Sequence, residues 1–241
     1  QFMFKKSAFL LTTLIVLSSS LQAQTVIAKY AGEFMALGVG GRALGMGGAF
    51  VAVANDVTSG YYNPAGLANI DYPQLALMHS EQFGNLVNYD YGAVAIPFQN
   101  DMSFGLSVMR LGVDGIPDTR NALYDANGDG IIDINNDRLD YSRITEFSNQ
   151  DWAFYLTFAK RQTEDFYWGI NAKIIRRDLA EFSATGIGFD VGAYYKPMEN
   201  LFLGANLQDA TTTLIAWSTG RNELVSPTLK IGTAYKVVEF L

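Results

Sequence analysis

An acidic loop near the middle of the chain has the residue types and the spacing of a calcium-binding loop. Residues 125–133 read Asp-Ala-Asn-Gly-Asp-Gly-Ile-Ile-Asp, which matches the start of an EF-hand-type loop. Oxygens at the first, third and fifth positions can converge on a hard cation, while the glycine at the sixth position allows a sharp turn. The predicted Ca²⁺ ligands are Asp125, Asn127, Asp129, Ile131, Asp133 and Asp137.

The match is incomplete at the last ligand position. The twelfth position holds Asn136, and Asp137 comes one residue late, so the usual bidentate glutamate is absent. Strands rather than helices are expected on both sides of the loop. A solvated acidic loop that faces outward is the alternative, and the sequence leaves both open.

Groups that could catalyse a reaction are scarce. The chain has one histidine and no cysteine, which excludes disulfides, cysteine nucleophiles and thiolate metal sites. His79 falls on an expected strand without an evident triad partner, which favours a structural place in a lumen or at an interface. The glycine-rich run 38–48 lacks the Gly-Lys-Ser/Thr ending of a phosphate-binding loop. We therefore expect a protein that is not an enzyme.

The composition is typical of a single β domain with little surface charge. Of the 241 residues, 49% are hydrophobic and 17% are charged, against about 25% charged in an average soluble domain. The net charge of −7 comes without a basic stripe, which argues against nucleic acid as a partner. Beyond the N-terminal segment, no apolar run approaches the roughly 20 residues that a membrane-spanning helix needs.

Residues 1–23 have the three-part pattern of a secretory signal peptide. Lys5 and Lys6 form a positive region, residues 7–17 form an apolar core, and small residues precede an expected cleavage after Ala23. An N-terminal membrane anchor is the alternative, although the apolar core is short for a span. The sequence thus predicts an exported protein.

From residue 74 onward, apolar and polar residues alternate with the period of a β-strand. Phe154, Leu156 and Phe158, for example, alternate with small or polar residues. The pattern predicts about eight strands, most of about 9–12 residues, a length that lets a tilted strand cross a bilayer. Short turns join some strands, and the long stretches 112–149 and 209–226 join others, as in outer-membrane barrels.

The strands of a soluble β-sandwich would show the same alternation. The composition of the polar face therefore decides between a soluble sandwich and a membrane barrel. In these strands the polar face is rich in Gly, Ser, Asn, Thr and Ala and poor in charges. Such residues suit a barrel lumen better than an open water surface, and aromatic residues gather near the strand ends as in interfacial girdles. We therefore predict an all-β fold, a transmembrane antiparallel β-barrel in contact with the lipid of a bacterial outer membrane.

The segment before these strands differs from them, because small residues dominate it and permit close backbone packing. Gly-Val-Gly-Gly-Arg-Ala-Leu-Gly-Met-Gly-Gly-Ala-Phe-Val-Ala occupies 38–52, and Tyr-Asn-Pro-Ala-Gly-Leu-Ala occupies 62–68. Asn63-Pro64 is a turn signal, and residues 65–69 can form a short helical turn. A segment of this kind can fold inside a barrel as a plug.

These two runs resemble the FadL-like outer-membrane transporter superfamily, and more closely its PorV/PorQ branch. The resemblance implies a barrel of about fourteen strands with an N-terminal hatch in its lumen. The hatch residues that it implies are Asn63, Pro64, Ala65 and Gly66. The predicted divisions are a signal peptide at 1–23, a hatch or plug segment at 24–72 and a barrel at 73–241. Because about eight strands fall short of about fourteen, the barrel is expected to be incomplete at its C-terminus.

The resemblance implies two alternative functions. PorV/PorQ-type members resemble components of type IX secretion, which gives a barrel that handles secreted cargo with secretion-system proteins as partners. FadL-type members look like passive channels, which gives transport of hydrophobic small molecules. A channel predicts an apolar pocket near the hatch, whereas a secretion partner predicts a plugged barrel whose outer loops, including 112–149, carry the function. Beyond Ca²⁺ at the acidic loop, no cofactor is expected.

Overall fold

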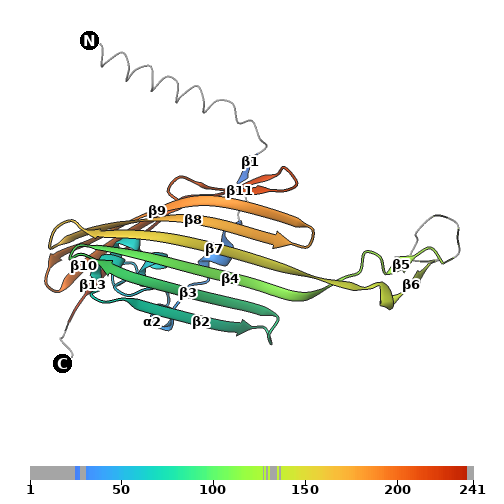
Figure 1. Ribbon diagram of the computed structural model, residues 1–241, viewed down its shortest axis with the longest axis horizontal. Coiled ribbons are helices and arrows are strands. Elements are labelled where there is room, and N and C mark those ends of the chain that lie inside the picture. The colour runs from blue at the N-terminus through green and yellow to red at the C-terminus, as the bar shows by residue number, and fades with distance from the viewer. Residues whose placement is uncertain are drawn as a thin grey trace, which may run out of the picture.

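A long antiparallel meander forms the body of the molecule. The computed structural model describes residues 25–27, 31–126, 128, 130, 135 and 137–237. In these residues eight strands lie in sequence order, each hydrogen-bonded to the next (Figure 1). They are β2 (Gln74–Gln82), β3 (Val87–Phe98), β4 (Met102–Asp118), β7 (Thr145–Arg161), β8 (Phe166–Leu179), β9 (Phe182–Met198), β10 (Leu201–Gln208) and β13 (Thr228–Tyr235). The predicted signal peptide, residues 1–23, lies outside the described residues.

Three shorter strands extend the sheet from β9. Residues 184–187 of β9 pair with β11 (Thr213–Trp217), whereas residues 191–198 pair with β10. β12 (Asn222–Val225) pairs with β11, and β1 (Thr25–Ile27) adds to β12 in parallel. The sheet therefore divides into two branches beyond β9.

The structure confirms the expected strands and corrects the long connections. The meander strands lie where the alternation predicts them, and β4, β7, β8 and β9 are longer than expected. The prediction of a long loop at 209–226 is wrong, because β11 and β12 lie there. These strands are too short for two-residue alternation to stand out in the sequence.

The stretch 112–149 is not a plain loop either. It contains the ends of β4 and β7, a small separate sheet of β5 (Leu123–Tyr124) and β6 (Arg138–Leu139), and the 3-10 turn η3 (Tyr141–Arg143). The last β4 residues pair with the first β7 residues after a bulge between Val113 and Ile116. This stretch therefore projects from the sheet as a two-stranded extension (Figure 1).

The other helices are short and precede β2. They are η1 (Glu33–Ala36), α2 (Gly41–Gly45), α3 (Ser59–Tyr62) and η2 (Pro64–Asn69). The predicted helical turn at 65–69 is confirmed by η2. Among the described residues, no helix is long and apolar enough to cross a membrane.

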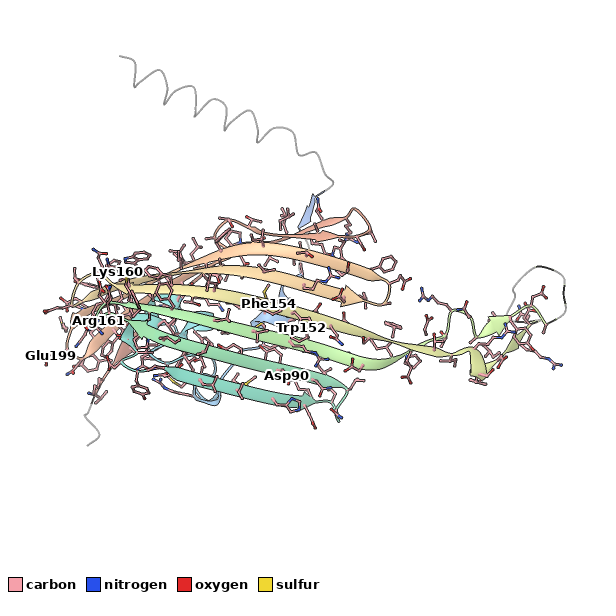
Figure 2. All side chains as sticks on the ribbon, viewed as in Figure 1. Asp90, Trp152, Phe154, Lys160, Arg161 and Glu199 are labelled. Carbon is pink, nitrogen blue, oxygen red and sulfur yellow. The ribbon has the colours of Figure 1, made fainter. Side chains whose placement is uncertain are left out.

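The two faces of the sheet differ sharply in chemistry. Residues 31–70 pack on one face, which we call the inner face; the opposite one is the outer face. Because side chains alternate across a pleated strand, Tyr155 and Thr157 of β7 are buried on the inner face. Phe154 and Leu156, on the outer face, are 42% and 60% exposed (Figure 2). Other exposed apolar side chains of the outer face are Leu75, Leu77, Val94, Ile96, Phe104, Leu106, Ile170, Ile174, Ile187, Phe189, Val191, Leu203, Leu229 and Ile231.

Glycines on the inner face let residues 50–66 approach the strand backbone. A Cβ at Gly192 would lie 2.2 Å from Oδ1 of Asn63, and one at Gly204 would lie 2.2 Å from the Val51 carbonyl oxygen. A Cβ at Gly169 would lie 2.5 Å from the carbonyl carbon of Pro64. We call these three residues, on β8, β9 and β10, the glycine lane.

The ends of the meander are open within the described residues. β2 pairs only with β3, and β13 pairs only with β10, so the outer edge of each has no strand partner in this part of the chain. The all-β, mostly antiparallel fold is confirmed. Closure into a barrel stays a prediction.

The glycine lane gives a direct test of this packing. Replacing Gly192 by Ala places a Cβ against Asn63 and Pro64, and overpacking of this kind costs about 1–3 kcal/mol. Gly41→Ala is the matched control, because a Cβ there meets nothing within 4 Å. We expect thermal unfolding to show a lower midpoint for Gly192→Ala only; equal midpoints for the two variants would contradict the close approach.

Candidate functional site

Asn63 fixes the segment of residues 31–70 to the sheet. Its side chain is fully buried, and its Nδ2 donates to the Val51 carbonyl at 2.8 Å and to the Ala193 carbonyl of β9 at 3.0 Å. Its Oδ1 accepts from the backbone N–H of Ala65 at 3.2 Å. One amide group therefore joins three separate stretches of backbone.

The local sequence explains why Asn63 stands there. Asn63 is extended, with φ −160°, and caps the first turn of η2, a position that asparagine favours because its side chain can accept a backbone N–H. Pro64 follows at the first helical position, where no backbone hydrogen bond is lost. The predicted hatch residues Asn63, Pro64, Ala65 and Gly66 are all buried.

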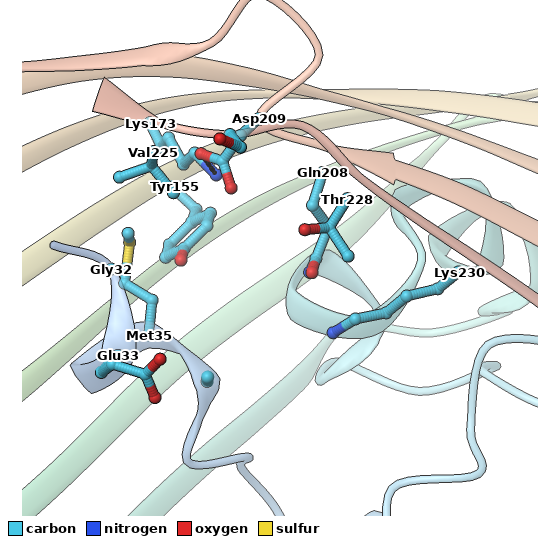
Figure 3. Close-up of a pocket in the computed structure, with 12 residues that line it drawn as sticks. Gly32, Glu33, Met35, Tyr155, Lys173, Gln208, Asp209, Val225, Thr228 and Lys230 are labelled. Carbon is cyan, nitrogen blue, oxygen red and sulfur yellow. Dashed lines mark ion pairs between the residues drawn. The ribbon is translucent and has the colours of Figure 1, made fainter. Parts of the chain in front are cut away.

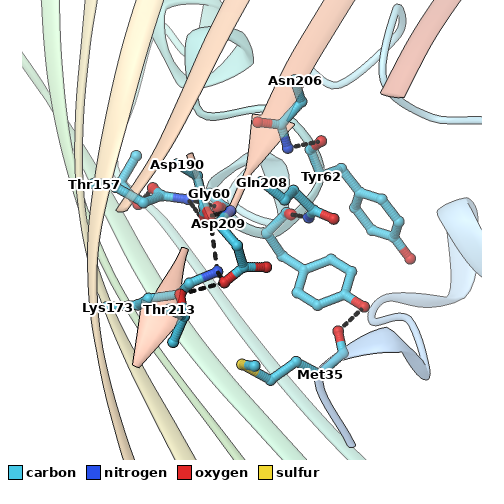
Figure 4. Close-up of polar contacts among 12 residues, drawn as sticks. Met35, Gly60, Tyr62, Thr157, Lys173, Asp190, Asn206, Gln208, Asp209 and Thr213 are labelled. Carbon is cyan, nitrogen blue, oxygen red and sulfur yellow. Dashed lines mark hydrogen bonds and ion pairs between the residues drawn. The ribbon is translucent and has the colours of Figure 1, made fainter. Parts of the chain in front are cut away.

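Three amide side chains from two strands bind the carbonyl groups of α3. Asn171 of β8 donates to the Gly60 carbonyl at 2.6 Å, and Asn206 of β10 donates to the Tyr62 carbonyl at 2.9 Å (Figure 4). Gln208 of β10 donates to the Tyr61 carbonyl at 3.3 Å. α3 is too short to satisfy these carbonyls internally, so the sheet supplies their donors.

Two tyrosine hydroxyls then hold the glycine-rich run. The Tyr61 hydroxyl donates to the Met35 carbonyl at 2.6 Å and accepts from the Gly38 N–H at 3.1 Å. The Tyr62 hydroxyl donates to the Val39 carbonyl at 2.9 Å and accepts from its N–H at 3.0 Å. Burial raises the pKa of Tyr61 and of Tyr62, so both keep the proton that they donate.

A buried ion network lies on the inner face beside α3. Nζ of Lys173 lies 2.8 Å from Asp190 and 2.6 Å from Asp209, and the three side chains are 3%, 2% and 10% exposed. Asn171 donates to Asp190 at 3.1 Å, and the Thr213 hydroxyl donates to Asp209 (Figure 4). Removing charges from water is costly unless each is paired and hydrogen-bonded, so this network fixes the relative positions of β8, β9 and the start of the β11 branch.

The sequence alone does not predict this network. Lys173 and Asp190 stand out in hindsight, because each is a charge on a strand face otherwise made of small residues. The alternation places Lys173 and Asp190 on the polar face, but it does not give the register between strands. Only the register that pairs Asn171 with Asp190 brings the two charges together.

A cavity opens next to the network. It has a volume of about 450 Å³ and lies between η1 and the strands β7, β8, β10 and β13 (Figure 3). Its charged lining comes from Glu33, Lys173, Asp209 and Lys230, together with the hydroxyl-bearing Tyr155.

A second cavity, of about 580 Å³, lies at the short-turn end of the sheet. It is lined by the aromatic rings of Tyr167, Tyr194 and Phe202 and by the cations Arg42 and Lys196. The rings of Tyr167 and Tyr194 are stacked with their centroids 5.5 Å apart.

The predicted calcium loop falls largely outside the described residues. This is the case for Asn127, Asp129, Ile131 and Asp133, four of the six predicted ligands. Asp125 accepts from the N–H groups of Gly128 and Gly130 at 2.6 and 2.8 Å. Asp137 accepts from the N–H of Ala126 at 3.0 Å. In the described part of the chain no group of three or more His, Asp or Glu side chains is placed to hold a metal ion, and Ca²⁺ binding stays a prediction.

His79 lies on the outer face of β2 rather than beside the buried network. Its Nδ1 is 2.6 Å from Asp90 and its Nε2 is 3.3 Å from Glu81, and its side chain is 57% exposed. Asp90 also contacts Arg110 at 3.2 Å. This arrangement is a surface ion network across β2, β3 and β4.

A protein-family model matches part of the chain. The model of a family described as an uncharacterised protein family, UPF0164, matches residues 12–136, slightly more than half of the chain. The matched range includes the glycine-rich run and Asn63. No curated protein matches the sequence.

Asn63 is the residue whose loss should loosen the segment most. Asn63→Ala leaves two buried carbonyls and one N–H without their side-chain partner, and an unmade buried hydrogen bond costs about 1–3 kcal/mol. Asn69→Ala is the control, since it removes only a 3.3 Å bond at a partly exposed site. We expect limited proteolysis to cut Asn63→Ala first within residues 31–70; equal protection of both variants would show that Asn63 is not the anchor.

Proposed function

The chain belongs to the uncharacterised protein family UPF0164, and we propose that it is an outer-membrane β-barrel protein that handles secreted proteins. In this proposal residues 1–23 direct export, the meander crosses the outer membrane, and residues 31–70 plug the lumen. The resemblance of residues 38–52 and 62–68 to the PorV/PorQ branch of the FadL-like superfamily supports the secretion role.

The observation that carries the membrane proposal is the inverted chemistry of the two faces. A soluble sheet buries its apolar face and exposes its polar one. Here Leu156 and Ile174 are 60% and 55% exposed on the outer face, while Asn171 and Lys173 are 0% and 3% exposed on the inner face. Lipid is the medium in which an exposed apolar face and a buried polar face are both favourable.

The height of the apolar surface also fits a bilayer. On the outer face of β7, Trp152 and Lys160 flank the apolar Phe154, Leu156 and Phe158 (Figure 2). At about 3.3 Å per residue, the distance from Trp152 to Lys160 is about 26 Å along the strand. A barrel tilt of about 40° reduces it to about 20 Å, against a typical band of about 25 Å.

The two open edges set a further requirement. Lipid offers no hydrogen bonds, so unpaired strand edges do not occur there. The proposal therefore includes further strands that pair with β2 and β13 and close the barrel, as in the superfamily that the segment resembles.

A projecting arm favours a role in binding another protein over a role as a simple channel. Between residues 113 and 148, β4 and β7 pair with each other and with no other strand of the meander. Leu139 and Tyr141 on this arm are 54% and 75% exposed. Apolar side chains raised above a membrane surface in this way suit contact with another protein.

The second candidate function is passage of hydrophobic molecules. It is favoured by the cavity of about 580 Å³ lined by Tyr167, Tyr194 and Phe202. Two observations weigh against it as the main role: Arg42 and Lys196 charge the lining of that cavity, and residues 31–70 cover the inner face.

The function is tested by replacing arm residues 119–144 with a short Gly/Ser linker. We expect a strain that carries this variant, like a strain that lacks the gene, to lose surface delivery of secreted proteins while the barrel still inserts. Normal delivery in both strains, together with fatty acid bound in the purified barrel, would favour the channel instead.

The membrane proposal has its own test at Leu156. Leu156→Arg places a charge on the outer face, where a midplane Arg costs about 2–4 kcal/mol in a membrane barrel. We expect this variant to insert poorly into lipid vesicles, as seen by heat-modifiable electrophoretic mobility. Glu199→Arg, in the turn between β9 and β10, is the control and should insert normally. A protein that stays monodisperse without detergent would contradict the proposal.

The arm is fastened at its base by a pH-sensitive contact. Arg120 lies 2.6 Å from Asp118 and 2.6 Å from Glu181 in the β8–β9 turn. Hydrogen bonds from Arg120 lower the pKa of Asp118 to about 2 and also lower the pKa of Glu181. Because both pKa values lie below those of the unfolded chain, the contact stabilises the arm at neutral pH and is lost as the pH falls toward 2.

A carboxyl-carbon NMR titration measures this directly. We expect Asp118 to titrate near pH 2, and Arg120→Gln to raise the midpoints of both Asp118 and Glu181. An unchanged midpoint for Glu181 in that variant would mean that the arm is not held to the turn.

A further inference from the structure

The cavity beside Lys173 carries unmatched charges of both signs. It has a volume of about 450 Å³ (Figure 3), which is in the range of small-molecule sites, about 300–1,000 Å³. Residues from η1 form one wall, and β7, β8, β10, β12 and β13 contribute to the others.

One end of the cavity has an excess of negative charge. Lys173 is a single cation shared by Asp190 and Asp209, so the three groups together keep one uncompensated negative charge. Lys173 and Thr213 both contact Oδ1 of Asp209. Its Oδ2 receives no hydrogen bond from the described residues.

Tyr155 adds a polar group without a partner at the same end. Its residue is 4% exposed, yet no side chain or backbone group of the described chain hydrogen-bonds to its hydroxyl. The hydroxyl points into the cavity, toward the η1 wall (Figure 3). The ring is buried while the hydroxyl is open to the cavity, so it can hydrogen-bond to a ligand group there.

Lys230 and Glu33 bring unpaired charges to the other walls. Lys230 extends from β13 into the space, and Glu33 faces it from η1 (Figure 3). Both residues are exposed, and neither forms an ion pair with a described residue, so each is free to meet a charged ligand group. A ligand that is only a cation would leave Lys230 unmatched, and one that is only an anion would leave Asp209 and Tyr155 unmatched.

We propose that this cavity binds a small zwitterion, with its ammonium group against Asp209 and Tyr155 and its carboxylate on Lys230. A free amino acid or a short peptide has this chemistry. Glu33 provides a second acceptor for the ammonium group. The site is independent of the proposed secretion role, because it is made by the inner face and η1 and not by the arm.

The test is calorimetric titration of the purified protein with alanylalanine as the probe. We expect saturable binding of the dipeptide, and binding at least about tenfold weaker for propylamine or propionate, since a charge-assisted hydrogen bond contributes about that factor. Propylamine binding as tight as the dipeptide would overturn the assignment of the carboxylate to Lys230.

Variants locate the ligand. Tyr155→Phe and Lys230→Gln should each weaken alanylalanine binding by about tenfold, and both leave the Lys173 ion pairs intact. Asp209→Asn should abolish binding, with thermal unfolding as the check that it is folded. Lys196→Gln, in the other cavity, is the matched control and should bind normally. Absence of saturable binding, or unchanged binding in Tyr155→Phe and Lys230→Gln, would overturn the proposal.

Discussion

Contact between two backbones, without side chains between them, is the constraint from which the rest of the structure follows. Residues 50–66 lie on the glycine lane so closely that a methyl group at Gly169 or Gly204 would overlap their backbone. Backbone groups buried this way need hydrogen-bond partners. Amide side chains of the strands and of Asn63 supply those partners. Where the segment docks, the inner face must then be small or polar, and many apolar residues of the same strands face outward.

The same constraint explains why charges are buried on the inner face. Apolar side chains there would fill the space that the segment needs, whereas a polar face offers hydrogen bonds to charged groups. Asn171 links the two features, because its Nδ2 donates both to the Gly60 carbonyl of α3 and to Asp190 of the ion network. The docking of residues 31–70 and the ion pairs of Lys173 are therefore connected through the Asn171 side chain.

The strands were well predicted from the sequence. The two faces of each strand lie in different environments, so apolar and polar residues alternate along it. The sequence also predicted the turn at Asn63-Pro64 and the short helix after it, since capping residues act locally. It missed the ion network, since Lys173 and Asp190 meet only through strand register, and it missed β11 and β12, which are too short to show alternation. Tyr155 was read only as one side chain of a strand, because nothing local distinguishes a tyrosine that lines a cavity.

The bond between Asn63 and Ala193 has a consequence for the order of folding. These residues are 130 positions apart in the chain, so the partner that Asn63 requires is made long after Asn63 itself. Contacts between such distant residues are slow to form, because closing the intervening chain costs entropy before any contact is gained. The segment of residues 31–70 must therefore remain undocked until β8, β9 and β10 have paired. During that interval its aromatic side chains and the glycine lane are both accessible, so this is the stage at which premature association with other chains is most favoured.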